Sequence, residues 1–211
     1  MAKGSKRGQN PFGGPLDRWT LGEAVFSLRD PNRLATLTEL YETERFEGLR
    51  RRLAAFYGAS LATELVLTLV PDGETQPEVF DLTVGTFGRL SAAEPAACRS
   101  VALAFAWRLL GQLGYGSDLS RCVECGAAVG GVGAEFSAAA GGSVCRRCRS
   151  VGRVVRLSAK AVEAAGFLSA ADWDEVGRVR LSEATAGSLR SALSARVEEL
   201  AGRQLTATRY V

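Results

Sequence analysis

The chain has 211 residues, 46% hydrophobic and 23% charged, a balance that is typical of a folded globular protein and argues against disorder throughout. Its formal net charge is only +3, so the overall charge selects no class of partner. It contains no histidine, which excludes Ser-His-Asp and Cys-His catalysis, histidine-ligated catalytic zinc and facial-triad metal sites.

No stretch approaches the roughly twenty apolar residues that a membrane span needs. The most apolar runs are interrupted by Thr63, Glu64 and Arg108. The N-terminus carries basic residues with no apolar segment behind them, so it does not resemble a secretory signal. We therefore expect a cytoplasmic protein that does not bind membranes.

The first 46 residues predict a small β element. Residues 1–15 are rich in Gly, Ser, Lys and Pro without periodicity, which is typical of a basic arm or loop. Residues 19–30 and 34–41 alternate in part between apolar and polar side chains, and Asp30-Pro31-Asn32 lies between them as a turn signal. This pattern predicts an antiparallel hairpin.

From Phe46 the apolar period becomes helical. The residues expected on one buried face are Leu49, Leu53, Phe56, Tyr57, Leu61, Leu65 and Leu69, and Pro71-Asp72-Gly73 ends the helix. A second helix is predicted from Pro77 to about Leu90, and a third from Pro95 to about Leu113. The third is apolar on all sides, so we expect it at the centre of a bundle.

The cysteine-bearing segment, residues 119–152, is rich in glycine and has no long periodic element. After it, Ser158 is expected to cap a short helix, and Asp172-Trp-Asp-Glu175 to begin another. Ser182-Glu183 precedes a last predicted helix over 184–203. The expected fold class is α+β, with a β element at 1–46 and a mainly helical domain at 47–211 that carries an inserted knuckle at 119–152.

Four of the five cysteines form two C-x-x-C pairs, Cys122/Cys125 and Cys145/Cys148, separated by nineteen residues. This spacing is typical of a four-cysteine zinc site, because each C-x-x-C turn presents two thiolates at adjacent corners of a tetrahedron. The sequence therefore predicts a structural Zn²⁺ ion bound by Cys122, Cys125, Cys145 and Cys148. Disulfides and a redox pair are the weaker alternatives, and four sulfurs leave no open position for catalytic zinc. Cys98 is expected to be a small buried hydrophobic residue.

Basic charge is concentrated in two places that could face a phosphate backbone. Residues 1–18 carry Lys3, Lys6, Arg7 and Arg18 against Asp17, and the segment from Arg121 to Arg156 carries six arginines against Glu124 and Glu135. The arginines beside the cysteines are Arg121, Arg146, Arg147 and Arg149. They could offset the negative charge of the metal site, contact phosphates, or do both.

Several strings together resemble the RecO family of bacterial recombination mediators. Cys122-x-x-Cys125-Gly126 is followed by Phe136-Ser137 and then by Gly141-Gly142-x-x-Cys145-x-x-Cys148. The approach, Leu110-Gly-Gln-Leu-Gly-Tyr-Gly116, is similar to the family, as are Glu78-Val-Phe-Asp-Leu82 and the closing Gly202-Arg-Gln-Leu205. The resemblance implies a partial OB-fold at 1–46 that lacks the first strands of the family's barrel.

The resemblance implies a mediator that is not an enzyme. It would bind single- and double-stranded DNA, promote annealing, and help to load RecA together with RecR in the nucleoid. It would also bind the C-terminal tail of single-stranded-DNA-binding protein. An OB-fold presents basic residues and aromatic rings to the strand. The DNA-binding candidates are Lys3, Lys6, Arg7, Arg18, Arg29, Arg33, Arg50, Arg51 and Arg52.

Other interpretations remain open at this point. Trp19 fits a core position better than a stacking platform, and Arg50 to Arg52 equally fit a solvated helix face. The alternative function is a zinc-knuckle adaptor that binds RNA or protein and has no part in recombination. A nuclease built on Asp172, Asp174 and Glu175 is disfavoured, because these carboxylates suit the first turn of a helix.

Overall fold

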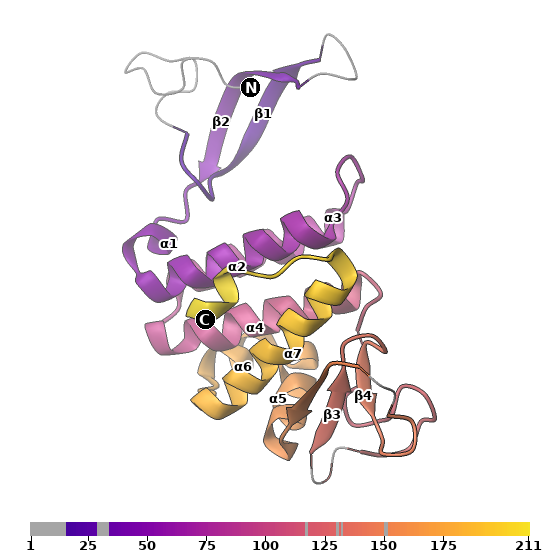
Figure 1. Cartoon of the computed structure of the whole chain (residues 1–211). Coiled ribbons are helices and arrows are strands. Elements are labelled where there is room, and N and C mark those ends of the chain that lie inside the picture. Colours follow the sequence, from indigo (N-terminus) through magenta and orange to yellow (C-terminus); the bar gives the residue numbers. More distant parts are fainter. Residues whose placement is uncertain (1–15, 29–33, 117, 130, 132, 150–151) are drawn as a thin grey trace. The chain divides into compact units, whose positions relative to one another are not determined.

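The computed structural model describes residues 16–28, 34–116, 118–129, 131, 133–149 and 152–211 (Figure 1). The chain divides into two compact units, Met1–Glu47 and Gly48–Val211, and each is described by itself. None of the helices in the described part has both the length and the apolar character needed to cross a bilayer.

The first unit contains the predicted antiparallel hairpin, built from β1 (Leu21–Ser27) and β2 (Thr36–Glu44). The second strand continues to Glu44, beyond the predicted end at Tyr41. Position 22 needs a glycine, because a Cβ atom there would lie only 2.5 Å from the Tyr41 carbonyl oxygen of the neighbouring strand.

The first predicted helix is in fact two helices, α1 (Gly48–Arg51) and α2 (Leu53–Leu69). The break lies at Arg52, whose backbone is extended (φ −124°, ψ 122°). Its guanidinium donates hydrogen bonds to the carbonyl oxygens of Ser91 and Ala93, the latter at 2.6 Å. These acceptors lie at the end of α3 (Pro77–Ala92), so Arg52 joins two helix ends.

The prediction that Leu53 lies on the buried face of α2 is wrong, because its exposed fraction is 68%. Leu61 and Leu65 on the same helix are fully buried, as predicted. Leu53 precedes Leu61 by eight positions, which turns it about 80° around the helix axis. Apolar residues repeated at intervals of four therefore shift gradually around the helix and leave the buried face.

The central position of the third predicted helix is confirmed. This helix, α4 (Pro95–Gln112), packs against α2 and α3 on one side and against α5, α6 and α7 on others. Every residue from Val101 to Trp107 is buried. Pro77 and Pro95 both lie in the first turn of their helices, where proline removes no internal hydrogen bond.

The helices α5 (Ala159–Ala170), α6 (Trp173–Arg178) and α7 (Glu183–Ala201) follow their predicted capping residues. Ser158 Oγ accepts a hydrogen bond from the Ala161 N–H at 3.2 Å. The Glu175 carboxylate accepts from the Asp172 N–H at 3.1 Å. These contacts satisfy N–H groups that have no partner inside the helix. The 3₁₀ helix η1 (Ala207–Tyr210) closes the chain.

The segment for which no long element was predicted contains two short strands, β3 (Ala134–Ser137) and β4 (Gly142–Val144). With β5 (Val154–Leu157) they form an antiparallel sheet in the order β4-β3-β5. Strands of three or four residues are too short to produce a recognisable alternation. Gly141 makes the β3–β4 turn with a φ of +74°, a conformation that favours glycine.

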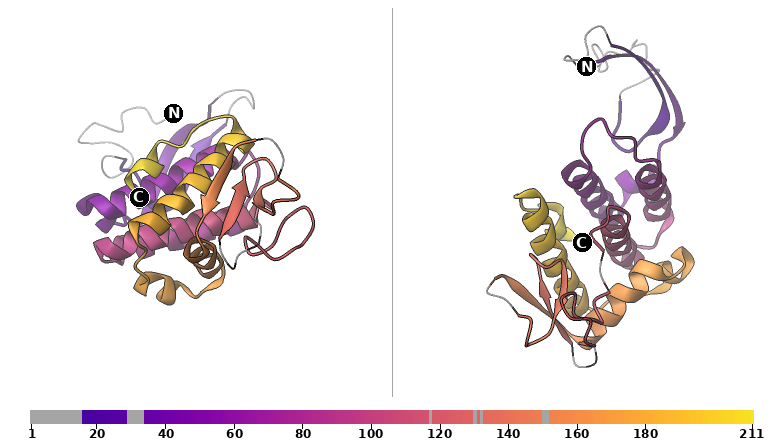
Figure 2. Two further views of the ribbon diagram at one scale, coloured as in Figure 1. Left: turned by 60° about the horizontal axis from the view of Figure 1, so that its bottom comes forward. Right: turned by 90° about the vertical axis from the view of Figure 1, so that its right-hand side faces the viewer.

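A buried aromatic pair and a hydrogen bond attach this sheet to the helical bundle. Phe136 of β3 has an exposed fraction of 1% and contacts Trp107 of α4 edge-to-face, with ring centroids 6.3 Å apart. The Arg196 side chain of α7 donates to the Ala138 carbonyl oxygen at 2.8 Å. Figure 2 shows the sheet beside α7 in both views, in agreement with the packing of β5 on that helix.

One carboxylate accepts several hydrogen bonds from the C-terminal segment. Glu64 of α2 accepts hydrogen bonds from the backbone N–H groups of Thr206 and Ala207, both at 2.8 Å, and from the Thr206 hydroxyl at 2.6 Å. Burial opposes ionisation, but the hydrogen bonds from Thr206 and Ala207 outweigh it, and the pKa of Glu64 is lowered from its ordinary value of 4.5.

We predict that Glu64→Gln lowers the free energy of unfolding at neutral pH by about 1 to 2 kcal/mol, because charge-assisted hydrogen bonds are lost. A lowered folded-state pKa stabilises the protein above the unfolded-state pKa and ceases to do so as pH falls through the folded-state value. The deficit should therefore shrink below about pH 4.5. Urea titrations at several pH values measure this deficit. Glu199→Gln is the control, because Glu199 is an exposed residue of α7. A deficit that is independent of pH would contradict it.

Candidate metal centre

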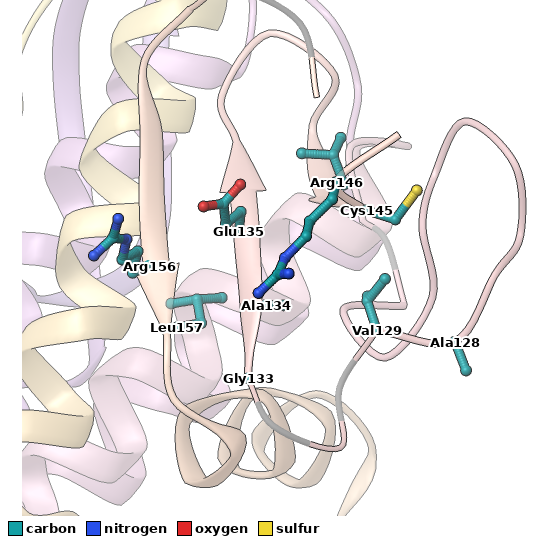
Figure 3. Close-up of a pocket in the computed structure, with 10 residues that line it drawn as sticks. Ala128, Val129, Gly133, Ala134, Glu135, Cys145, Arg146, Arg156 and Leu157 are labelled. Atoms are coloured by element: carbon teal, nitrogen blue, oxygen red, sulfur yellow. The ribbon is translucent and has the colours of Figure 1, made fainter. Parts of the chain in front are cut away.

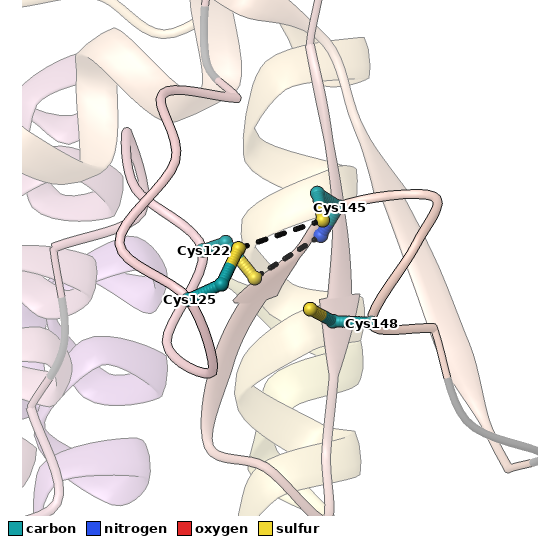
Figure 4. Close-up of side chains that lie close together, drawn as sticks. All are labelled: Cys122, Cys125, Cys145 and Cys148. Atoms are coloured by element: carbon teal, nitrogen blue, oxygen red, sulfur yellow. Dashed lines mark hydrogen bonds between the residues drawn. The ribbon is translucent and has the colours of Figure 1, made fainter.

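Two loops supply the four paired cysteines. Cys122 and Cys125 lie in the loop after α4, and Cys145 and Cys148 lie directly after β4. Their four sulfur atoms lie within 4.8 Å of one another, and the Cys125 and Cys145 sulfurs are 3.8 Å apart (Figure 4). The structure thus brings together the four residues that the sequence analysis selected as ligands.

Backbone hydrogen bonds shape both C-x-x-C turns. The Gly126 N–H donates to the Cys122 carbonyl oxygen at 2.8 Å, and Gly126 has a φ of +72° that a side chain would disfavour. The Cys148 N–H donates to the Cys145 carbonyl oxygen at 3.1 Å. The two turns meet where the Cys145 N–H points at the Cys122 sulfur, at 3.4 Å (Figure 4).

The sulfur positions fit a tetrahedral thiolate site. A metal ion with metal–sulfur bonds of about 2.3 Å at the centre of a regular tetrahedron separates its sulfurs by about 3.8 Å. The Cys125–Cys145 separation of 3.8 Å has this length, and the remaining separations stay below 4.8 Å. Four cysteines so placed could hold one metal ion.

The electrostatics of the cluster call for a cation. The N–H of Cys145 lowers the pKa of the Cys122 thiol to about 6, since it donates toward the sulfur. The pKa of Cys148 is instead raised to about 12, chiefly by its hydrogen bond with Cys125 and then by its other sulfur neighbours. The sulfurs therefore cannot all ionise by themselves near neutral pH. A bound divalent cation would offset two of the four negative charges and favour ionisation of the thiols.

Cys98 is separate from this cluster, as predicted. It lies on α4 with an exposed fraction of 2%, and its thiol contacts the Glu94 carbonyl oxygen at 3.5 Å. Burial, the main cause, raises the pKa of this thiol, so the reactive thiolate is disfavoured.

Several arginines near the cysteines form ion pairs. Arg149 pairs with Glu135 of β3 at 3.2 Å, and Arg153 pairs with Glu198 of α7 at 2.5 Å. Arg121 lies 3.9 Å from the Asp118 carboxylate. These three arginines thus have acidic partners close by.

A pocket of about 520 Å³ opens on the sheet beside the cysteines (Figure 3). Glu135 and Arg156 are direct partners across β3 and β5, so their side chains share one face, and Arg146 reaches the same pocket from the cysteine loop. In the sequence, Arg156 is recognisable only as the last of the six arginines of the basic segment 121–156, with no mark that sets it apart as a contact.

The predicted DNA-binding residues fall into three groups. Lys3, Lys6, Arg7, Arg29 and Arg33 lie outside the described residues. Arg18 and Arg51 are exposed, and Arg50 is half-buried on α1. The Arg52 guanidinium is engaged by the carbonyl oxygens at the end of α3.

The described part of the first unit is acidic. In residues 16–28 and 34–47, six Asp or Glu side chains stand against two arginines, Arg18 and Arg45. Arg45 also pairs with Glu42, its neighbour on the hairpin. The hairpin as described therefore repels phosphate groups more than it attracts them.

Comparisons with known proteins identify the family of this chain. The family model described as "Recombination protein O C terminal" matches residues 50–209, which include the helical bundle and all four paired cysteines. The chain belongs to the RecO family. A similar protein, "DNA repair protein RecO" of Anaeromyxobacter dehalogenans strain 2CP-C, is 33% identical over 213 residues, covering 100% of this chain and 83% of the relative.

Relatives from other bacteria agree. "DNA repair protein RecO" of Roseiflexus sp. strain RS-1 is 29% identical over 196 residues, covering 92% of this chain and 68% of the relative. The protein of the same name from Rhodopirellula baltica is 32% identical over 151 residues, covering 71% of this chain and 55% of the relative. The resemblance drawn from the sequence strings is thus confirmed.

Proposed function

We propose that this chain acts in DNA repair as a recombination mediator. The observation that carries the proposal is the family match over residues 50–209, together with relatives named DNA repair protein RecO. The family match outweighs the alternative of an RNA- or protein-binding adaptor, which no specific contact in the structure favours.

In this proposal the protein binds single- and double-stranded DNA, promotes annealing, and helps to load RecA together with RecR. It also binds the C-terminal tail of single-stranded-DNA-binding protein. In this proposal the chain is not an enzyme, and a four-sulfur metal shell would leave no open position for a catalytic water. Its work is to hold strands and partners together.

The first unit contributes to DNA binding as part of an OB-fold in this proposal. Its hairpin is acidic where it is described, so affinity for phosphates there depends on the basic arm and the hairpin loop, with Lys3, Lys6, Arg7, Arg29 and Arg33. Arg18 is an exposed candidate in the first unit, and Arg50 and Arg51 are candidates in the second unit. Arg52 acts chiefly as a structural contact between helices.

We also propose that the metal is Zn²⁺ and that its role is structural. The support is the sulfur geometry: four thiolates and separations near 3.8 Å suit the tetrahedral preference of zinc. The ion would link the loop that carries Cys122 to the loop that carries Cys148. Its binding free energy would then contribute to folding.

We predict that Cys145→Ser loses the metal and lowers the melting temperature markedly, because a structural site couples metal affinity to folding. Cys98→Ala is the matched control, since Cys98 is buried but lies outside the cluster, and it should keep one zinc per chain. Metal content and thermal unfolding measure both effects. A Cys145→Ser protein without zinc that melts at the wild-type temperature would refute a structural role.

We predict that the protein binds a fluorescent single-stranded oligonucleotide with a log affinity that falls linearly with log salt. The slope should be about −0.7 for each phosphate that an arginine or lysine neutralises. Fluorescence anisotropy between about 50 and 200 mM salt measures this slope. Failure to bind either form of DNA, with or without the tail peptide of single-stranded-DNA-binding protein, would overturn the proposal. Binding of RNA but not DNA would support the adaptor instead.

A further inference from the structure

Three arginines on or next to the β4-β3-β5 sheet have no acidic partner among the described residues. Arg146, Arg147 and Arg156 are exposed, and none of their guanidinium groups forms a hydrogen bond or ion pair with another described residue. This distinguishes them from Arg149 and Arg153 nearby, which are paired with carboxylates. Exposed guanidinium groups without a partner keep their hydrogen-bond donors available to a ligand.

Two of these arginines belong to one pocket. Arg146 and Arg156 line the pocket of about 520 Å³ from the cysteine loop and from β5 (Figure 3). Glu135 is the one carboxylate among its described lining residues, and Arg149 already pairs with it at 3.2 Å. Two guanidinium groups without an acidic partner therefore line the pocket, against one carboxylate that is already paired.

The character of the lining favours an extended anion over an apolar side chain. Apart from Leu157, the uncharged positions hold small or medium residues, namely Ala128, Val129, Gly133, Ala134, Val144 and Cys145. No aromatic ring is among the described lining residues, so base stacking is not expected at this site. Contact with phosphate groups, without sequence preference, is what this chemistry offers.

We propose that this sheet face binds the phosphate backbone of nucleic acid, with Arg146 and Arg156 as the principal contacts. The site lies in the second unit and is additional to the basic arm and hairpin of the first. The inference rests on the proposed function, since it names a second surface for the same DNA. The metal site fixes one contact, because Arg146 directly follows the ligand Cys145.

The test is DNA binding by the full chain with Arg146→Ala/Arg156→Ala. Arg178→Ala/Arg209→Ala is the matched control, since these two arginines are equally exposed, have no described partner, and line no pocket with the first pair. Anisotropy with a labelled single-stranded oligonucleotide should show about tenfold weaker binding for the first variant. Its salt slope should be shallower by about 1.4, for two phosphate contacts. The control should bind like the wild type.

Two further measurements keep the outcomes separate. Zinc content and melting temperature check that Arg146→Ala has not disturbed the cysteine loop, and Arg156→Ala alone, on β5 away from that loop, should still weaken binding and flatten the slope. If the wild type binds DNA and both double variants bind equally well, the sheet face is refuted while the proposed function stands. If the wild type binds no DNA, both fail.

An acidic peptide is the competing ligand. A labelled acidic peptide that binds the wild type and loses affinity in Arg146→Ala/Arg156→Ala, while DNA affinity is unchanged, would overturn the assignment to nucleic acid. Loss of DNA affinity in the sheet variant alone, with an unchanged affinity in the control, supports it.

Discussion

Four sulfur atoms within 4.8 Å of one another cannot all carry negative charge unless a cation lies between them. The raised pKa of Cys148 and the lowered pKa of Cys122 express this conflict in the thiols alone. A bound divalent ion would relieve it and would tie two loops of the cysteine segment together. Because these loops contain little regular structure, that closure would help to place the adjoining sheet.

The sheet also rests on the helical bundle. Phe136 is buried against Trp107 on the central helix α4, and Arg196 of α7 binds the backbone beside the β3–β4 turn. A metal ion would close the outer end of the segment, whereas the aromatic pair anchors its inner face. Together they would position Arg146 in its loop and Arg156 on β5.

The sequence predicted the parts of the fold that rest on long periodic patterns or on specific capping residues. The central helix followed from an uninterrupted apolar run, and α5 and α7 followed from Ser158 and Ser182. The break at Arg52 was missed because it arises from a tertiary contact with the end of α3, which no local pattern records. The strands β3 and β4 were missed because they are too short to show alternation.

The candidate site divides in the same way. The four cysteines were recognisable because the spacing of metal ligands is local, while the position of Arg156 in the pocket follows only from the pairing of β5 with β3. The ion pairs of Arg149 and Arg153 likewise depend on the tertiary structure and cannot be recognised in the sequence. The acidity of the described hairpin also shifts attention from the first unit toward the sheet of the second.

The most direct test of this account is the metal environment itself. X-ray absorption at the zinc edge, with metal analysis of the purified chain, should find one zinc per chain surrounded by four sulfurs at about 2.3 Å. That result would establish the closure on which the sheet and its arginines depend. A folded chain with its helical content intact that contains no metal, or a zinc ion bound mainly by oxygen or nitrogen, would contradict it.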